Sequence, residues 1–415
     1  MSNQNHTQAV RRDDAAPPSP SIQQHGSPWL AVLSVAIGAF ALVTTEFLPV
    51  GLLPAIAAEL GITEGMAGMM VTVPGIVAAL AAVLVTVGVG KADRRYVIWA
   101  LTTTLLVSNV IVALSDSFTL ILLGRALLGV GVGGFWAIGP ALGTRMVPAG
   151  SATRATSLIF AGVSVGTVAG VPAGALIGEL FGWRTAFYAG GAVALLVLLT
   201  QMWLLPKLPP KQAITFRQLP ELLRVPKARL GMLITLLVFI GQFAAYTYIT
   251  PFLSQVALLD AKTISSLLLA YGAAGFAGNL IGGAVVARSV RISLITTGLV
   301  LGLSTLALPL LGHGVWGATA LVVIWGIAFG MMPISVQTWI FQAAPHAMES
   351  GGAVFVATAQ VALASGALVG GIAVDHLGVS SAMVVGGVLA LAMAAITMRW
   401  ARDSEQPAVK LHAVH

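Results

Sequence analysis

The sequence predicts an all-α membrane protein with twelve transmembrane helices, on the evidence of its composition and the spacing of its apolar runs. Hydrophobic residues make up 57% of the 415 residues, charged residues only 8%, and the mean hydropathy is +0.94. A soluble domain carries about 25% charged residues, so most of this chain is not adapted to water. The apolar residues form runs of about 20, the length of helix that crosses a hydrocarbon core.

The twelve apolar runs are separated mostly by short connections, so consecutive spans are expected to run antiparallel. Patterns of this kind place span ends to within about two to four residues. The expected spans are 29–53, 65–89, 97–115, 118–142, 155–181, 185–205, 230–253, 263–287, 293–311, 317–342, 351–375 and 380–400.

One connection is longer and divides the spans six and six. It runs from Pro206 to Arg229 and is rich in Lys and Arg. The first tail is polar and contains several prolines, a composition typical of disorder. No cleavage site follows the first apolar run, which we therefore expect to be retained as a span. The predicted parts are a disordered cytoplasmic tail at 1–28, a six-helix half at 29–205, a cytoplasmic central loop at 206–229, a second six-helix half at 230–400 and a cytoplasmic tail at 401–415.

The distribution of basic residues predicts the orientation. The net charge of +7 and the pI of about 10.1 would suit a nucleic-acid partner, but the charges lie on one side of the predicted membrane. Every Lys and Arg except Arg125, Arg184 and Lys262 falls on the same side as the N-terminus. Cytoplasmic loops carry an excess of Lys and Arg. We therefore expect both termini in the cytoplasm, lipid as the surrounding partner, and no nucleic-acid partner.

The two halves repeat each other weakly. The segment 170–182 at the end of the fifth span aligns with the segment 366–378 at the end of the eleventh. In this alignment Glu179 matches Asp375, and both segments close on a glycine. Parallel repeats of six spans occur in transporters whose substrate site lies between the halves, near the middle of the membrane.

Glu46 is the most informative single residue because it lies inside the first predicted span. A charged side chain inside a span costs about 2.5–3.5 kcal/mol on insertion scales and marks a functional site by default. Burial favours the protonated form of a carboxyl group, which suits a proton carrier. The alternative is a carboxyl group that reaches the outer interface or makes a hydrogen bond in packing.

Arg125 is the other charge inside a span. Counted from the outer ends of the first and fourth spans at 1.5 Å per residue, Glu46 and Arg125 both lie about 10–12 Å deep. The two side chains are thus able to form a pair. A nearby guanidinium would favour the ionised carboxylate and so tune when the proton leaves. The alternative is a fixed structural salt bridge.

The fifth span carries a candidate gating motif. It has a glycine at every fourth residue, including Gly166, Gly170 and Gly174, with Pro172 among them. Small residues at this spacing permit close helix packing, and proline can kink a helix. The ridge is therefore either a tight, bendable contact between the halves or an ordinary packing surface.

A second candidate gate follows the second span, where Asp93 stands beside Arg94 among other basic residues. Asp93 can lock neighbouring helix ends when the cytoplasmic side is closed. The basic residues alone are equally explained by the rule for cytoplasmic loops, but that rule does not explain Asp93.

Uncharged polar and aromatic residues at mid-depth are the candidates for substrate contact. Gln242 and Tyr246 are four residues apart and share one face of the seventh span. Trp136, Asn279 and Gln360 lie within the fourth, eighth and eleventh spans. Each of the five, taken singly, can equally hold helices together. Together they describe a cavity for a neutral, polar solute, aromatic solutes included.

Enzyme and metal motifs are absent from the sequence. There is no cysteine, no cluster of metal ligands, and no G-x-x-x-x-G-K-[ST] loop that would indicate ATP. We expect a transporter, not an enzyme, without cofactor or metal, acting as a monomer on a small molecule and protons. Other possibilities are facilitated diffusion and a non-transporting membrane sensor, although a sensor usually carries a sizeable soluble domain.

Over about residues 29–400, these motifs resemble the twelve-span drug:H⁺ antiporter branch of the major facilitator superfamily. Gly124-Arg-x-x-x-Gly-x-Gly-x-Gly is similar to its span-4 motif and implies a role for Arg125 in proton transfer. Gly170-x-Pro-x-Gly, with Gly178-x-x-x-Gly-Trp-Arg184, is similar to its span-5 antiporter motif. The resemblance implies the major facilitator fold, with two six-helix pseudo-symmetric halves.

Four stretches resemble the bacterial purine ribonucleoside efflux pumps of this branch: Glu46-Phe-Leu-Pro-Val, Asp93-Arg-Arg-Tyr-Val, Gly-Gly-Phe-Trp-Ala137 and Gly241-Gln-Phe-Ala-Ala-Tyr-Thr-Tyr-Ile249. They imply proton-driven export of nucleosides such as inosine and its analogues across the bacterial inner membrane by alternating access. Multidrug and sugar exporters share most of these motifs and are the alternative. One departure is that Tyr96 follows Arg95, where the family motif continues with a glycine and further bases. Val89 also stands at its leading glycine, so the family's cytoplasmic lock is truncated here.

Overall fold

The structure is a computed structural model that describes residues 27–90, 92–209, 225–343 and 348–400. In these ranges the chain is helical and contains no strand. Twelve of its helices are long and apolar enough to cross a membrane, which confirms the predicted number of spans. The two predicted tails and most of the central loop lie outside the described residues. The predicted domain boundaries therefore stay predictions.

Each half supplies six spans, and one span in each half is an interrupted helix. The fifth span is α5, η2 and α6, where η2 is a single π-helical turn, and the seventh span is α9 and α10. The helices of the N-terminal half are α1 (Pro28–Leu60), α2 (Glu64–Gly88), α3 (Arg94–Leu114), α4 (Phe118–Met146), α5 (Ala152–Val165), η2 (Gly166–Gly170), α6 (Val171–Phe181) and α7 (Trp183–Leu204), with the short turn η1 (Ala149–Ser151) before α5. Those of the C-terminal half are α9 (Pro226–Tyr246), α10 (Ile249–Gln255), α11 (Ala261–Val286), α12 (Val290–Leu311), α13 (Gly314–Ala343), α14 (Met348–Leu377) and α15 (Ser380–Trp400).

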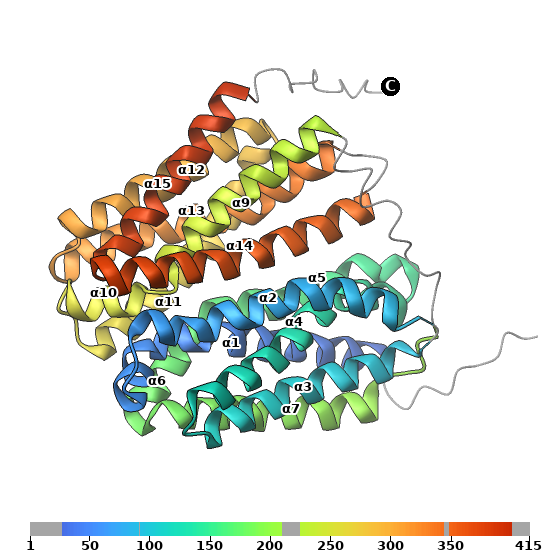
Figure 1. The fold of residues 1–415 in the computed structure, drawn as a ribbon. Helices are drawn as coiled ribbons and strands as arrows, with labels where there is room; N and C mark the ends of the chain where they lie inside the picture. Colours follow the sequence, from blue (N-terminus) through green and yellow to red (C-terminus); the bar gives the residue numbers. More distant parts are fainter. Residues whose placement is uncertain (1–26, 91, 210–224, 344–347, 401–415) are drawn as a thin grey trace, which may run out of the picture.

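The two halves lie side by side as two helix bundles, one above the other in Figure 1. Helix α14 of the C-terminal half packs along α2 of the N-terminal half, and α11 packs against α6 and η2. The helices run between two ends of the molecule, which we name the Asp375 end and the Asp93 end. The Asp375 end holds the turn at 61–63 and the connection at 256–260, and the Asp93 end holds the starts of α3 and α9.

Helix α1 is longer than predicted. The sequence places its end near residue 53, whereas the helix continues to Leu60 with Pro49 and Pro54 inside it. The helix ends at Gly61, which has a left-handed backbone with φ of 63° and is a typical glycine C-cap. The true end of the helix is therefore marked by this glycine and not by the second proline.

The predicted internal repeat is visible in the backbone. Gly182 and Gly378, which the alignment pairs, both follow a span and have φ of 86° and 85°. In both, the amide donates to the carbonyl oxygen four residues earlier. Side chains other than glycine rarely adopt this conformation, so the same turn chemistry ends the fifth and eleventh spans.

Candidate functional site

Arg125 is completely buried in α4 and binds only main-chain oxygens. Its Nη1 and Nη2 donate to the carbonyl oxygens of Thr45 and Glu46 on α1, both at 2.7 Å. Its Nε donates to the carbonyl oxygen of Met70 on α2, also at 2.7 Å. The guanidinium thus ties α4 to both α1 and α2 in the interior of the N-terminal half.

Glu46 and Arg125 lie together, as their matched depth predicts, but no direct ion pair joins the carboxylate to the guanidinium. The ion pairs found in the described part of the chain include none between the Glu46 carboxylate and the Arg125 guanidinium. The predicted alternative of a structural salt bridge is therefore wrong for this conformation. The guanidinium donates its hydrogen bonds to three carbonyl oxygens instead. The Glu46 carboxylate is therefore free to bind another partner.

The Glu46 carboxyl group links the two halves. Its side chain is only 4% exposed, and its Oε1 accepts a hydrogen bond of 3.4 Å from Nε2 of Gln360 on α14. The predicted alternative of a carboxyl group at the outer interface therefore does not apply. A buried acid whose hydrogen-bond partner belongs to the opposite half can connect its protonation state to the packing of the halves.

Aromatic side chains form a wall next to Glu46, mostly from the C-terminal half. Phe47 of α1 stacks on Phe243 with ring centroids 5.7 Å apart and meets Tyr246 edge-on at 6.5 Å. Tyr246 stacks on Tyr271 of α11 at 5.0 Å. Trp325 of α13 meets Tyr246 edge-on at 6.2 Å. These contacts bring the predicted substrate residue Tyr246 to the same region as Glu46 and Gln360.

Gln242 makes hydrogen bonds to two members of this wall, Tyr271 and Trp325. It is completely buried; its Oε1 accepts from Trp325 Nε1 at 2.8 Å, and its Nε2 donates to the Tyr271 hydroxyl at 2.7 Å. Both polar ends of the amide are therefore engaged inside the C-terminal half. In this conformation Gln242 holds helices together, the alternative that the sequence left open, and substrate contact by its side chain stays a prediction.

We expect Gln242→Leu to lower the stability of the folded protein. The substitution leaves the Tyr271 hydroxyl and the Trp325 N–H without their partner, and each unsatisfied buried group costs about 1–3 kcal/mol. Thermal unfolding in detergent measures the loss. Thr103→Ala on the exposed face of α3 is the control, and equal stability of the two variants would contradict the prediction.

Two predicted substrate residues lie away from this wall. Trp136 is half-buried within the N-terminal half, where its ring packs against Phe135 at 6.0 Å and against Phe160 of α5 at 6.3 Å. Asn279 is exposed on α11. It lies seven residues, or two turns, beyond Gly272, which packs against Val168 of η2. The structure therefore does not gather all five predicted residues in one place.

The glycine ridge of the fifth span packs against α1, within one half. A Cβ atom on Gly166 would lie 2.9 Å from the carbonyl oxygen of Phe40, and Gly170 and Gly174 approach Thr44 and Leu48. The proposed contact between the halves is therefore wrong for these glycines, because their face is turned to α1. Pro172 lies two residues after η2, whose π-helical turn is a form often found at functional sites. A gating role for the ridge stays a prediction.

Asp93 and Arg94 hold the N-terminal half together at their own end. Oδ1 of Asp93 accepts from the backbone N–H groups of Arg95 at 3.0 Å and Leu208 at 2.9 Å. The N–H of Arg94 donates to the carbonyl oxygen of Leu208 at 3.0 Å. The acid thus caps α3 and fastens the chain that follows α7, while its action as a lock stays a prediction.

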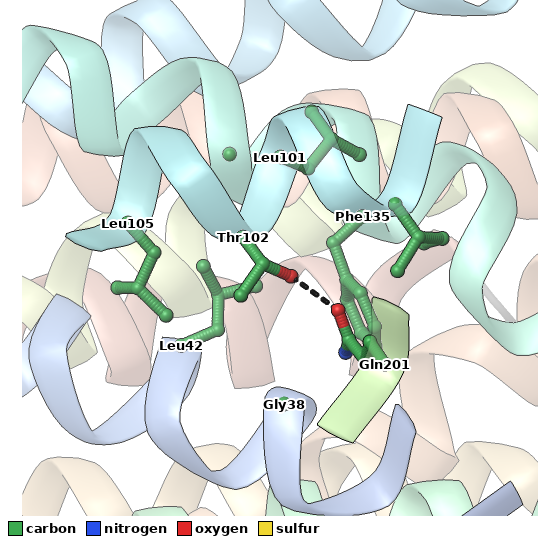
Figure 2. Close-up of a pocket in the computed structure, with 9 residues that line it drawn as sticks. Gly38, Leu42, Leu101, Thr102, Leu105, Phe135 and Gln201 are labelled. Atoms are coloured by element: carbon green, nitrogen blue, oxygen red, sulfur yellow. Dashed lines mark hydrogen bonds between the residues drawn. The ribbon is translucent and has the colours of Figure 1, made fainter. Parts of the chain in front are cut away.

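A small cavity is present inside the N-terminal half, and none of the residues that line it belongs to the aromatic wall. Figure 2 shows it between α1, α3, α4 and α7, with the hydrogen bond of 2.8 Å from Thr102 to Gln201 at its edge. Its volume of about 20 Å³ is room for about one water molecule. Small-molecule sites have about 300–1,000 Å³, so this cavity is not the substrate site.

Comparisons with known proteins agree with this architecture. The family model described as Major Facilitator Superfamily matches residues 35–364. The chain belongs to the major facilitator superfamily. As a member of the superfamily it is a membrane transporter and not an enzyme, and its two six-helix halves are those of the major facilitator fold.

Several curated members of the superfamily are similar to this chain. The purine ribonucleoside efflux pump NepI of Escherichia coli O6:K15:H31 (strain 536 / UPEC) is 39% identical over 363 residues, which cover 88% of this chain and 92% of that protein. The pump of the same name from Salmonella paratyphi A (strain ATCC 9150 / SARB42) is 37% identical over 394 residues, or 95% of this chain and 97% of the relative. The Salmonella typhimurium protein matches over the same shares at 37%.

Sequence reasoning missed part of the site. Phe47, Tyr271 and Trp325 form the aromatic wall with Tyr246, but aromatic residues in apolar spans carry no pattern that separates a wall from ordinary packing. Pro49 enters the sequence prediction only as part of the motif Glu46-Phe-Leu-Pro-Val. Its spacing of four residues from Thr45 is a signal that the sequence does contain, because a proline frees the carbonyl oxygen four residues before it.

Proposed function

We propose that this protein is a proton-coupled exporter of purine ribonucleosides, inosine and its analogues included. The observation that carries the proposal is the buried Glu46 carboxyl group, whose hydrogen-bond partner Gln360 belongs to the opposite half. The similarity to pumps named for purine ribonucleoside efflux supports the substrate class. The aromatic wall beside Glu46 supports it too, because aromatic rings stack on flat bases.

In the proposed cycle Glu46 takes a proton from outside, the halves reorient, and release of the proton inside accompanies loading of the nucleoside. We place the protein in the inner membrane of a bacterium as a monomer, with both termini in the cytoplasm, on the distribution of Lys and Arg. The Asp93 end is then cytoplasmic and the Asp375 end external. Asn279, exposed on α11 toward the Asp93 end, stays a predicted contact for a solute that enters from the cytoplasm.

The test is transport in liposomes that contain the purified protein. We expect a pH gradient to drive accumulation of labelled inosine and the substrate to drive proton movement in return. Ethidium and lactose serve as probes of the alternative reading as a multidrug or sugar exporter. Gradient-driven transport of either probe without inosine would reject the nucleoside assignment, and inosine transport that ignores the gradient would indicate facilitated diffusion.

The external end is held closed by Asp375 of α14. Its Oδ2 accepts from the Thr63 hydroxyl at 2.8 Å, and its Oδ1 accepts from the N–H of Gly65 at 3.0 Å, both on the N-terminal half. Next to this contact, Gln255 donates to the Glu64 carboxylate at 2.6 Å. These bonds join the halves at one end, as alternating access requires of a conformation that is closed to the outside.

We expect Asp375→Ala to shift the protein toward the outward-open conformation. Loss of these exposed bonds costs about 1 kcal/mol, a change of about fivefold in the ratio of the two conformations. Because the chain has no cysteine, Ala364→Cys, which faces Gly75 of α2, can report the opening through a membrane-impermeant maleimide added outside. Glu179→Gln, at the matching place in the repeat, is the control. Unchanged labelling in Asp375→Ala would contradict the prediction.

A further inference from the structure

Two of the three oxygens that Arg125 binds belong to carbonyl groups that a proline leaves without a donor. In an α-helix the N–H of each residue donates to the carbonyl oxygen four residues earlier, and proline has no N–H. Pro49 therefore leaves the carbonyl of Thr45 free in α1, and Pro74 leaves that of Met70 free in α2. Arg125 donates to both of these oxygens at 2.7 Å.

We propose that Arg125 is a positioning residue that replaces the two main-chain donors removed by Pro49 and Pro74 and so fixes the main chain around Glu46. The third bond, from Nη2 to the carbonyl oxygen of Glu46 itself, extends this hold to the residue that carries the carboxyl group. The inference rests on the proposed role of Glu46 in proton coupling. It assigns Arg125 an action through the backbone, where the resemblance implied a part in proton transfer.

The membrane explains why a charged side chain is needed for this task. No water reaches free carbonyl groups in the hydrocarbon region, so each must find a donor within the protein. Arg125 is 0% exposed, and its three bonds supply donors to oxygens on two helices at once. Only a planar guanidinium presents several N–H groups in a rigid fork, whereas the ammonium group of lysine is a compact point charge.

The arrangement also separates two tasks within α1. The guanidinium holds the carbonyl groups of Thr45 and Glu46, while the Glu46 side chain extends to Gln360 of the other half. The carboxyl group is thus free to gain or lose a proton and to change its bond to Gln360 without releasing the helix that carries it. A fixed backbone beneath a changing side chain is what a repeated proton cycle requires.

The test restores the missing amides. Arg125→Gln is expected to lower the midpoint of thermal unfolding in detergent by about 5 °C or more and to abolish transport driven by a pH gradient. Adding Pro49→Ala and Pro74→Ala returns an N–H to each helix, and we expect the triple variant to regain at least half of the lost stability. The double variant Pro49→Ala with Pro74→Ala, which keeps Arg125, is the control that shows whether the protein still folds with alanine at both positions. Pro54→Ala, whose partner carbonyl Arg125 does not bind, is the matched control and should restore nothing.

Transport by the triple variant distinguishes positioning from proton transfer. Because Glu46 is intact, we expect gradient-driven transport to return in part, with the pH profile of the wild type. A triple variant that is stable but does not respond to the gradient would overturn the proposal, and so would full stability of Arg125→Lys or rescue by Pro54→Ala. If Arg125→Gln does not fold, recovery of a monodisperse protein by the two alanines is the same test. The stability measurements need no substrate, so they stand even if the nucleoside assignment fails.

Discussion

Glu46→Gln is expected to reduce transport driven by a pH gradient to the rate seen without a gradient. The amide has the size of the carboxyl group and can still bind Gln360, which donates to Glu46 at 3.4 Å. It cannot gain or lose a proton, so it mimics a permanently protonated acid. Substrate exchange at equal pH on both sides is expected to continue, because exchange needs only reorientation of the loaded protein. Liposomes with and without a gradient, loaded with labelled inosine, separate the two activities.

The control for this prediction is Glu179→Gln. Glu179 is also an acid of the N-terminal half, but it is exposed on α6 near the Asp375 end, and its loss should leave the gradient response unchanged. A gradient response in Glu46→Gln equal to that of the wild type would reject Glu46 as the proton site. Loss of exchange as well as of the gradient response would instead point to a defect in the substrate site or the fold.

The fold and the depth of the charges could be predicted from the sequence because both depend on local patterns. Runs of apolar residues report helix length directly, and all twelve predicted spans are present. The depths of Glu46 and Arg125 follow from residue counts, and the bond between Arg125 and the Glu46 carbonyl at 2.7 Å confirms that they are matched. The end of α1 was placed near residue 53, but the helix runs through Pro54 to Leu60, because an interior proline is tolerated where neighbouring helices satisfy the freed carbonyl.

The direction of side chains could not be predicted, and it decides what the site is. Arg125 was expected near a carboxylate, but its guanidinium binds backbone carbonyl oxygens instead. The only trace of these acceptors in the sequence is the pair of prolines, Pro49 and Pro74, that leave two of them without a donor. Gln242 was expected to contact substrate, yet it is completely buried and its amide is fully engaged by Tyr271 and Trp325. Such partners come from distant helices, and no periodicity in one helix reports them.

The same limit applies to the glycine ridge, whose periodicity was clear but whose neighbour was not. The ridge packs on α1, the helix of Glu46, so its effect on gating must pass through that helix. Movement of the fifth span relative to α1 would displace Glu46, whereas the contact between the halves is made elsewhere, as at Val168 and Gly272. The ridge and the inter-half contact are therefore different surfaces of one interrupted helix, and η2 lies at their junction.

Gly166→Val is expected to impair both stability and transport. A Cβ atom at Gly166 would lie 2.9 Å from the carbonyl oxygen of Phe40, a backbone atom that cannot turn away as a side chain can. Overpacking of this kind costs about 1–3 kcal/mol. The strain falls on the contact between η2 and the stretch of α1 that leads to Glu46. We therefore expect gradient-driven transport to be slower per folded molecule, in addition to a smaller amount of folded protein. Thermal unfolding and transport per folded molecule measure the two effects.

Gly88→Val is the matched control, because a Cβ atom there meets nothing within 4 Å. It adds the same side chain to a membrane helix, α2, without forcing two helices apart. Gly166→Ala should fall between the two, since it brings the clashing Cβ but not the further methyl groups. If Gly166→Val is as stable and as active as Gly88→Val, then close approach of the fifth span to α1 is not required, and the ridge is a consequence of membrane helix composition alone.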